Sequence, residues 1–333
     1  MRDERIDVAR GLLIAGVVVG HLIERSSDWE GGVQRLALTG LYAMHMPAFV
    51  FLTGLLAKPG ELVRKTLGLA SVLIVFQSIY ITFLTATGHP LKEWYWPYWV
   101  LWYVMALIVW QFLVPAIRRW PVQMFTLSCV GVLLIGLAQW HGNWFAYQRV
   151  FTFAPFFVAG CAWGRKILDF ARSCHIVIKI LALLSFAGAV LVLYLRNPNP
   201  HWLFQNWTFE QLGVEPLNGM LLRSIVTLVG ALGTFAFLAL MPSRARSAIW
   251  LGERTLAIFI GHVFAVLAFD WWIVPHLVSL PGSVVLAANI ALGIGLSYLF
   301  TWRPLVVLTN GVRRLPDELL RTPDPSKPQR QAS

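Results

Sequence analysis

Three ionisable side chains lie in the first apolar segment of the sequence, "ARGLLIAGVVVGHLIE". Arg10 and His21 are eleven positions apart, so an α-helix would place them on one face, about 16 Å apart along its axis. Glu24, one turn beyond His21, falls near the same face. A guanidinium suits the binding of phosphates, and an imidazole can accept a proton from a hydroxyl. The spacing therefore suits anion binding at one end of a helix and base chemistry near the other.

Two further histidines lie inside apolar segments. His45 precedes Pro47 in "LYAMHMPAFVFLTGLLA", at a depth expected to match that of His21 on an adjacent antiparallel helix. His262 lies midway along "GERTLAIFIGHVF", and Thr255, seven residues earlier, faces the same way. Ionisable residues inside membrane spans are functional candidates by default. A structural reading stays open for each of them: Arg10 as a boundary marker and the histidines as polar contacts between helices.

The elements that must position these side chains are membrane helices. Of the 333 residues, 57% are apolar and 13% are charged, whereas soluble domains are near a quarter charged. A membrane-spanning helix needs about 20 mostly apolar residues. Stretches of this kind occur at 8–24, 37–57, 62–87, 98–117, 122–139, 150–168, 175–195, 220–241, 249–271 and 281–302. The expected fold is all-α, a polytopic membrane bundle of about ten transmembrane helices.

The basic residues are divided unevenly between the two sides of this bundle. With the N-terminus in the cytoplasm, 21 of the 27 Lys and Arg residues fall on the cytoplasmic side. This division predicts that both termini are cytoplasmic. We expect residues 1–310 to form the transmembrane domain and residues 311–333 to form a disordered cytoplasmic tail. The segment 196–219, rich in Pro, Asn and Trp, is expected to be an outer interfacial loop without helical periodicity.

Neither nucleic-acid binding nor a metal site is indicated. The net charge is +11, but the cations lie in short clusters between apolar runs, without a basic domain or a stacking platform. Cys129, Cys161 and Cys174 have no metal-ligand spacing, so we expect free thiols and no metal. No soluble catalytic domain is recognisable, so any chemistry is expected to belong to the membrane bundle.

Five segments, in order, resemble the acyltransferase-3 family of integral membrane proteins. "IDVARGLLIAGVVVGH" has the Arg, ten residues, then His that mark the first helix of the family, at Arg10 and His21. "HMPAFVFLTG" is similar to the "HMPLFFFISG" pattern of the fucose 4-O-acetylase-like branch, with Thr53 where serine is common. "LWYVMALIVW", "APFFVAGCAWGRK" and "LGERTLAIFIGHVF" resemble three later helices. Trp102 and His262 then match family positions, and the family also has ten spans.

The resemblance implies transfer of an acyl group, usually acetyl from acetyl-CoA, to a sugar hydroxyl. The implied acceptor is a surface polysaccharide or a glycolipid, and the implied location is the bacterial inner membrane, in contact with lipids. Some relatives carry an extracytoplasmic hydrolase-like domain, which is not recognisable in this sequence. We therefore expect the protein to act alone, as a homo-oligomer, or with a separate extracytoplasmic partner.

Roles for individual residues follow from this resemblance and from their chemistry. His21 is expected to be the general base, with Glu24 or His45 orienting it or contacting the sugar, and an acetyl-histidine intermediate is the alternative. Arg10 is expected to bind the CoA phosphates. The other candidates for the donor site are Arg5, Arg64 and Lys65. Those for the acceptor site are Arg149, Arg223, Trp102 and His262, and the two arginines also fit a role as interfacial anchors.

Two other functional classes stay open. One is a transporter or flippase that moves a glycolipid or an acyl donor without chemistry, and the other is a membrane sensor or assembly subunit. Many transporters show a repeat between their two halves, and no convincing repeat is visible here. Acetyl transfer by the purified protein, lost in His21→Ala, would distinguish an enzyme from both.

Overall fold

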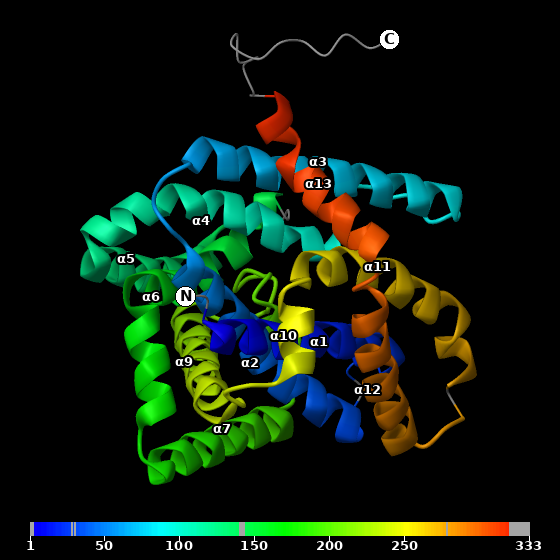
Figure 1. Cartoon of the computed structure of the whole chain (residues 1–333). Helices are drawn as coiled ribbons and strands as arrows, with labels where there is room; N and C mark the ends of the chain where they lie inside the picture. Colours follow the sequence, from blue (N-terminus) through cyan, green and yellow to red (C-terminus); the bar gives the residue numbers. More distant parts are fainter. Residues whose placement is uncertain (1–2, 28, 30, 140–143, 278, 320–333) are drawn as a thin grey trace, which may run out of the picture.

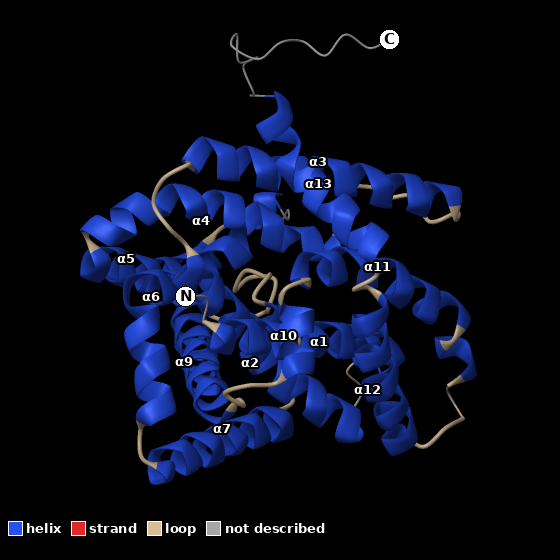
Figure 2. Cartoon of the chain, in the orientation of Figure 1, coloured by secondary structure: helices blue, strands red, loops and turns tan. Residues whose placement is uncertain are grey.

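The computed structural model describes residues 3–27, 29, 31–139, 144–277 and 279–319, and within them it contains helices, turns and loops but no strand (Figure 2). Eight helical stretches in this part are long and apolar enough to cross a membrane. They are α1 (Glu4–Ser27), α2 (Gly32–Leu56), α3 (Leu62–Ala86), η1 with α4 (Trp99–Arg119), α7 (Ile176–Arg196), α9 (Pro216–Leu240), α11 (Thr255–Trp272) and α12 (Gly282–Leu299). The predicted all-α polytopic bundle is confirmed.

The two remaining predicted spans are also helices. The fifth is α5 (Pro121–Leu134), a shorter apolar helix that continues as η2 (Ile135–Leu137). The sixth is α6 (Tyr147–Ser173), preceded by η3 (Trp144–Ala146), and its C-terminal part carries several charged residues. Each of the ten predicted ranges is therefore helical, although only eight helical stretches have the length and apolarity of a typical span.

Three predicted boundaries were wrong. The predicted span 249–271 is two helices, α10 (Arg246–Gly252) and α11, separated at Glu253 and Arg254, whose side chains pair at 3.1 Å. The predicted loop 196–219 contains a short helix, α8 (His201–Phe204), and α9 already begins within it. A short 3-10 turn, η4 (Val274–His276), follows α11.

The predicted disordered tail is the third difference. Residues 311–319 belong to α13 (Arg303–Leu319), and residues 320–333 lie outside the described part. This helix is amphipathic and packs across α3, where Val312 is buried and Asp317 pairs with Arg64 at 2.5 Å (Figure 1). Its polar composition resembled that of a tail because only one face of the helix is apolar.

The helices that carry the candidate residues lie at the centre of the bundle. α1 packs against α2, α10, α11 and α12, and α2 packs against α6, α7 and α9 as well (Figure 1). Glycines let α2 and α6 approach closely, because a Cβ on Gly54 would lie 2.1 Å from the Phe157 carbonyl oxygen. A Cβ on Gly160 would lie 2.0 Å from the Phe51 carbonyl oxygen. This close contact fixes the side chains of α2 and α6 relative to one another.

Contacts between helix ends agree with the two sides that the charge distribution predicts. At the predicted cytoplasmic end, polar contacts join Arg5 to Asp169, Arg64 to Asp317 and Arg118 to the Ala57 carbonyl. At the opposite end they join Arg25 to Asp270, Arg35 to the Pro198 carbonyl and Arg149 to the Phe204 carbonyl. Each of these contacts joins ends assigned to the same side. Which side faces the cytoplasm stays a prediction.

Candidate active site

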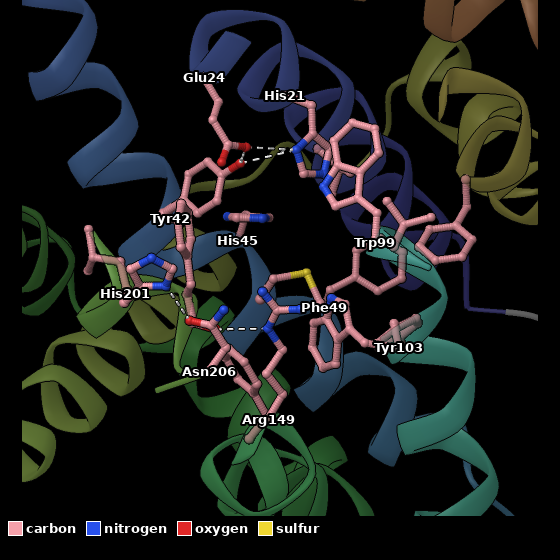
Figure 3. A pocket seen from close by; sticks show the side chains of 18 of the residues that line it. His21, Glu24, Tyr42, His45, Phe49, Trp99, Tyr103, Arg149, His201 and Asn206 are labelled. Carbon is pink, nitrogen blue, oxygen red and sulfur yellow. Dashed lines mark hydrogen bonds and ion pairs between the residues drawn. The ribbon is translucent and has the colours of Figure 1, made fainter. Parts of the chain in front are cut away.

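A cavity of about 290 Å³ lies inside the bundle and brings together residues that are far apart in the sequence (Figure 3). α1, α2, α4, α6, α11 and the 201–206 segment all contribute to its wall. Five residues that the sequence singled out line it: His21, Glu24, His45, Trp102 and Arg149. The first three were assigned to catalysis and the last two to the acceptor.

His21 and Glu24 form a hydrogen-bonded pair on α1. His21 Nδ1 lies 3.1 Å from Glu24 Oε2, so the neutral imidazole carries its proton on Nδ1 and donates it to the carboxylate. The Tyr42 hydroxyl donates to the same Glu24 oxygen at 2.5 Å and lies 3.1 Å from His21 Nδ1. Nε2 of His21 has no protein partner among the described residues. An imidazole held in this way by a carboxylate can accept a proton at Nε2.

Two aromatic rings pack against the His21 imidazole. The Trp99 ring lies 4.7 Å from it, centroid to centroid, and the His262 ring stacks nearly parallel at 5.5 Å. His262 is fully buried, its Nδ1 lies 3.0 Å from the Ile258 carbonyl oxygen, and its Nε2 has no partner among the described residues. His262 is not part of the cavity wall, so the structure places it behind the His21 ring and not against the cavity.

His45 presents a second imidazole to the cavity. Its Nδ1 donates to the Leu41 carbonyl oxygen at 2.7 Å, which leaves Nε2 as an acceptor. Its ring lies 4.8 Å from that of Tyr42, and within the described part of the chain no direct contact joins it to His21. His45 is therefore positioned to accept a hydrogen bond from a bound molecule, and no hydrogen bond from it orients the His21 ring.

Arg149 enters the cavity from the side opposite His21 and Glu24 in Figure 3. Its Nε donates to the Phe204 carbonyl oxygen at 3.0 Å, and its guanidinium carbon lies 5.0 Å from the centre of the Trp102 ring. Its two terminal amino groups have no protein partner in the described part of the chain. The guanidinium is thus held at one edge and open to the cavity at the other.

A second hollow, of about 630 Å³, shares Glu24, Arg25, His201 and Phe204 with the cavity and continues outward to Asp270. It gives the cavity an opening on the side opposite the predicted cytoplasmic end. His201 at this opening hydrogen-bonds Asn206 at 2.8 Å, and burial lowers the pKa of its imidazole. The opening is therefore lined mainly by neutral and aromatic groups around one ion pair.

Arg223 is not brought to the cavity. It is fully buried, and it donates to the Gln148 side-chain oxygen at 3.2 Å and to the Trp207 carbonyl oxygen at 2.6 Å. Its guanidinium also lies over the Phe209 ring at 4.8 Å. These contacts hold the 205–214 segment against α6 and α9, and Arg223 does not line the cavity.

The candidate donor residues lie at the other end of the bundle. Arg10 is partly exposed, and its Nη2 lies 2.5 Å from the Thr255 hydroxyl, with Asp7 at 3.6 Å. The other three have protein partners nearby: Arg5 with Asp3 and Asp169, Arg64 with Glu61 and Asp317, and Lys65 with the Lys58 carbonyl. Arg5 is on α1 with Arg10, whereas Arg64 and Lys65 are on α3.

Three aromatic side chains form the inner wall of the cavity, and we call them the aromatic septum: Phe49, Tyr103 and Phe259. The Tyr103 ring lies 5.8 Å from Phe49 and 5.8 Å from Phe259, and its hydroxyl bonds Thr53 at 2.5 Å. Arg10 does not line the cavity. In this structure the cavity therefore ends at the septum, short of Arg10.

A family model described as an acyltransferase domain matches residues 3–302. The chain belongs to this acyltransferase family. No curated protein and no solved structure matches it. The matched range includes α1 to α12 and every residue of the cavity wall, so the cavity of this membrane acyltransferase belongs to the family domain.

Several residues of the acyltransferase cavity were missed from the sequence: Tyr42, Trp99, Tyr103, His201 and Asn206. Tyr42 could have been predicted from its spacing, because it precedes His45 by three residues and so lies on the same helix face. Trp99 near the outer end of the bundle also fits a belt of aromatic residues at the membrane interface. The last two come from a segment without periodicity, and only the tertiary fold brings them to the cavity. Among the described residues, no cluster of three or more His, Cys, Asp or Glu could hold a metal ion.

Proposed function

We propose that this membrane acyltransferase is an O-acetyltransferase of the bacterial inner membrane. It moves an acetyl group from acetyl-CoA to a sugar hydroxyl of a cell-surface polysaccharide or glycolipid. The observation that carries the proposal is the His21–Glu24 pair, which leaves an imidazole nitrogen free inside a cavity large enough for small reacting groups. Membership of an acyltransferase family supplies the class of reaction.

The proposed reaction uses His21 Nε2 first as a base and then as an acid. Nε2 accepts the proton of the acceptor hydroxyl as its oxygen bonds to the thioester carbonyl carbon, and the carbonyl electron pair moves to oxygen. When the electron pair on this oxygen re-forms the carbonyl double bond, the carbon–sulfur bond breaks, and the proton passes from Nε2 to the CoA thiolate. Glu24 keeps the imidazole in the required tautomer and stabilises the imidazolium that forms.

The donor is proposed to enter from the cytoplasmic end. Arg10 would bind a CoA phosphate there, and the thin pantetheine arm would run along α1 toward His21, a span of about 16 Å at the rise of an α-helix. In this structure the aromatic septum lies across that route. The proposal therefore requires the septum side chains to move aside when acetyl-CoA binds.

The acceptor is proposed to enter through the outer opening. Its wall combines an ion pair, Arg25 with Asp270, with a side-chain amide and the aromatic rings of Trp29 and Trp207. Polar groups that can pair with hydroxyls, beside flat apolar rings, suit a sugar better than an acyl chain. His45 Nε2 is available to accept a hydrogen bond from a second hydroxyl.

The test uses purified protein in nanodiscs with labelled acetyl-CoA and a panel of bacterial oligosaccharides and glycolipids. We expect acetyl transfer by the wild type and a loss of about 100-fold or more in kcat for His21→Ala, the range of general acid–base catalysis. His276→Ala, which removes an exposed histidine from η4, is the matched control and should retain full activity. Transfer by His21→Ala at the wild-type rate would refute the catalytic assignment. Movement of a glycolipid across vesicles without acetyl transfer would support a flippase instead.

A further inference from the structure

Arg149 lies near the outer end of α6 and forms no salt bridge among the described residues, although the Glu24 carboxylate in the same cavity attracts it. The cavity holds a carboxylate, Glu24, but its Oε2 is already engaged by His21 and Tyr42, and no ion pair joins it to Arg149. A cation that faces a cavity inside a membrane protein without a salt bridge commonly marks a functional site. A negative charge that appears only during function would account for this arrangement.

The contacts of Arg149 orient its guanidinium toward that charge. The hydrogen bond from Nε to the Phe204 carbonyl fixes the inner edge of the guanidinium, and the Trp102 ring limits its tilt. The two terminal amino groups are left facing the cavity as parallel donors, on the side opposite the His21–Glu24 pair (Figure 3). Donors held in place before the reaction are the arrangement that stabilises developing charge most effectively.

We propose that Arg149 donates hydrogen bonds to the oxyanion that forms on the thioester carbonyl oxygen during acyl transfer. This inference rests on the proposed function and adds a second catalytic residue to it. His21 accepts the hydroxyl proton on one side of the reacting carbon, and Arg149 stabilises the negative oxygen on the other. The carbonyl oxygen becomes neutral again when the thiolate leaves.

The anionic oxygen that Arg149 binds has a second possible origin. It could belong to a carboxylate or phosphate group of the acceptor. The two sources predict different kinetics. An oxyanion exists only in the transition state and the tetrahedral intermediate, so its donor affects kcat, whereas an acceptor anion is bound in the ground state and affects KM for the acceptor. In the hydrolysis of acetyl-CoA by water no acceptor is present, so Arg149 can affect the rate of this reaction only through the oxyanion.

The experiment measures kcat and KM for acetyl transfer, and the rate of acetyl-CoA hydrolysis without acceptor, in wild type, Arg149→Gln and Arg149→Lys. We expect Arg149→Gln to lower kcat in both reactions by about 100-fold, the usual effect of removing one oxyanion donor, with little change in KM for the acceptor. Arg149→Lys keeps the charge but loses the two parallel donors of the guanidinium. Its kcat should therefore lie between that of the wild type and that of Arg149→Gln. Arg196→Gln, which removes an exposed arginine from the end of α7, should behave as the wild type.

Unchanged hydrolysis by Arg149→Gln, together with a raised KM for the acceptor, would overturn the proposal and assign Arg149 to an anionic acceptor. If Arg149→Gln does not fold, Arg149→Lys carries the test, and wild-type kcat in that variant would also overturn it. A wild type that neither transfers nor hydrolyses the acetyl group would refute the proposed function, and the role of Arg149 with it. This failure of the proposed function can be distinguished from a failure of the Arg149 proposal alone, because it is seen in the wild type before any variant is compared.

Discussion

Glu24 determines how the His21 imidazole can act. Because Glu24 accepts the Nδ1 proton, the lone pair of the neutral ring lies on Nε2. Tyr42 donates to the same carboxylate oxygen and so restricts where that carboxylate can move. Three side chains on two helices thus define one tautomer and one orientation.

Substitution of Glu24 should affect catalysis without removing the base. In Glu24→Gln the amide can donate to Nδ1, which favours the tautomer that carries its proton on Nε2 and blocks that nitrogen as a base. We expect kcat for acetyl transfer to fall about 100-fold or more, with KM for acetyl-CoA nearly unchanged. Steady-state kinetics on the purified variant measures this, and an unchanged kcat would remove Glu24 from the mechanism.

Tyr42→Phe should have a smaller effect than Glu24→Gln. It removes one hydrogen bond to a charged group, worth about 1.5–3 kcal/mol, while the His21–Glu24 pair remains. We expect a fall in kcat of roughly tenfold or somewhat more, measured in the same assay. A loss as large as that of His21→Ala would mean that the tyrosine itself takes part in proton transfer.

The residue types and spacing on α1 predicted its two most informative positions, but not their partners. Arg10 and His21 were recognisable because charge is rare in apolar segments. Whether Glu24 belonged to the site or only marked the membrane boundary could not be decided from one helix, because Tyr42 comes from another. The position of Arg223, against Gln148 and the Trp207 carbonyl, was hidden for the same reason.

At the scale of elements, α2 carries His45 and α6 carries Arg149, and the close contact between these two helices fixes the two side chains relative to one another. That contact depends on Gly54 and Gly160, each of which lies directly against a carbonyl of the other helix. A side chain at either position would separate the helices and widen the cavity. The reach of Arg149 into the cavity is therefore set by two glycines that are not themselves part of the cavity wall.

Gly54→Ala should destabilise the protein. Its Cβ would lie 2.1 Å from the Phe157 carbonyl oxygen, so the backbones must move apart, at a cost of about 1–3 kcal/mol. Gly188→Ala on α7 is the control, because no atom lies within 4 Å of the position that its new methyl group would take, and alanine favours the helix. Thermal unfolding in detergent should show a lower midpoint for the first variant only. Equal midpoints for the two variants would contradict this packing.

Hydropathy was sufficient to place the helices but not to divide them. All ten apolar ranges are helical, because a backbone in lipid must satisfy its own hydrogen bonds. The division between α10 and α11 lies at Glu253 and Arg254, inside a range whose mean apolarity still suits a span. α13 was missed because an amphipathic helix is less apolar on average than a span.

At the scale of the whole molecule, one arrangement connects the orientation of the chain with its reaction. Arg10 lies among the helix ends predicted to be cytoplasmic, whereas the hollow beside Glu24 and His201 lies at the opposite ends. A donor from one compartment and an acceptor from the other would meet at His21. The predicted orientation is therefore part of the proposed mechanism.

Labelling of the two ends of α3 should reveal this orientation. In a background with alanine at the three natural cysteine positions, we expect Pro59→Cys to resist a membrane-impermeant maleimide in intact cells and Pro90→Cys to react with it. Both positions are exposed and lie in loops at opposite ends of this helix. After permeabilisation both should react. The reverse pattern in intact cells would place the termini outside and exclude the proposed route for cytoplasmic acetyl-CoA.

The aromatic septum has an electrical consequence. If water fills the cavity, the transmembrane voltage would fall mainly across the layer of Phe49, Tyr103 and Phe259 in its wall. Each elementary charge that crosses 100 mV involves about 2.3 kcal/mol. In the proposed route, the phosphates of acetyl-CoA at Arg10 would stay outside this field, and the acetyl thioester that crosses it would be neutral. The septum would thus let an uncharged group pass while the membrane stays energised.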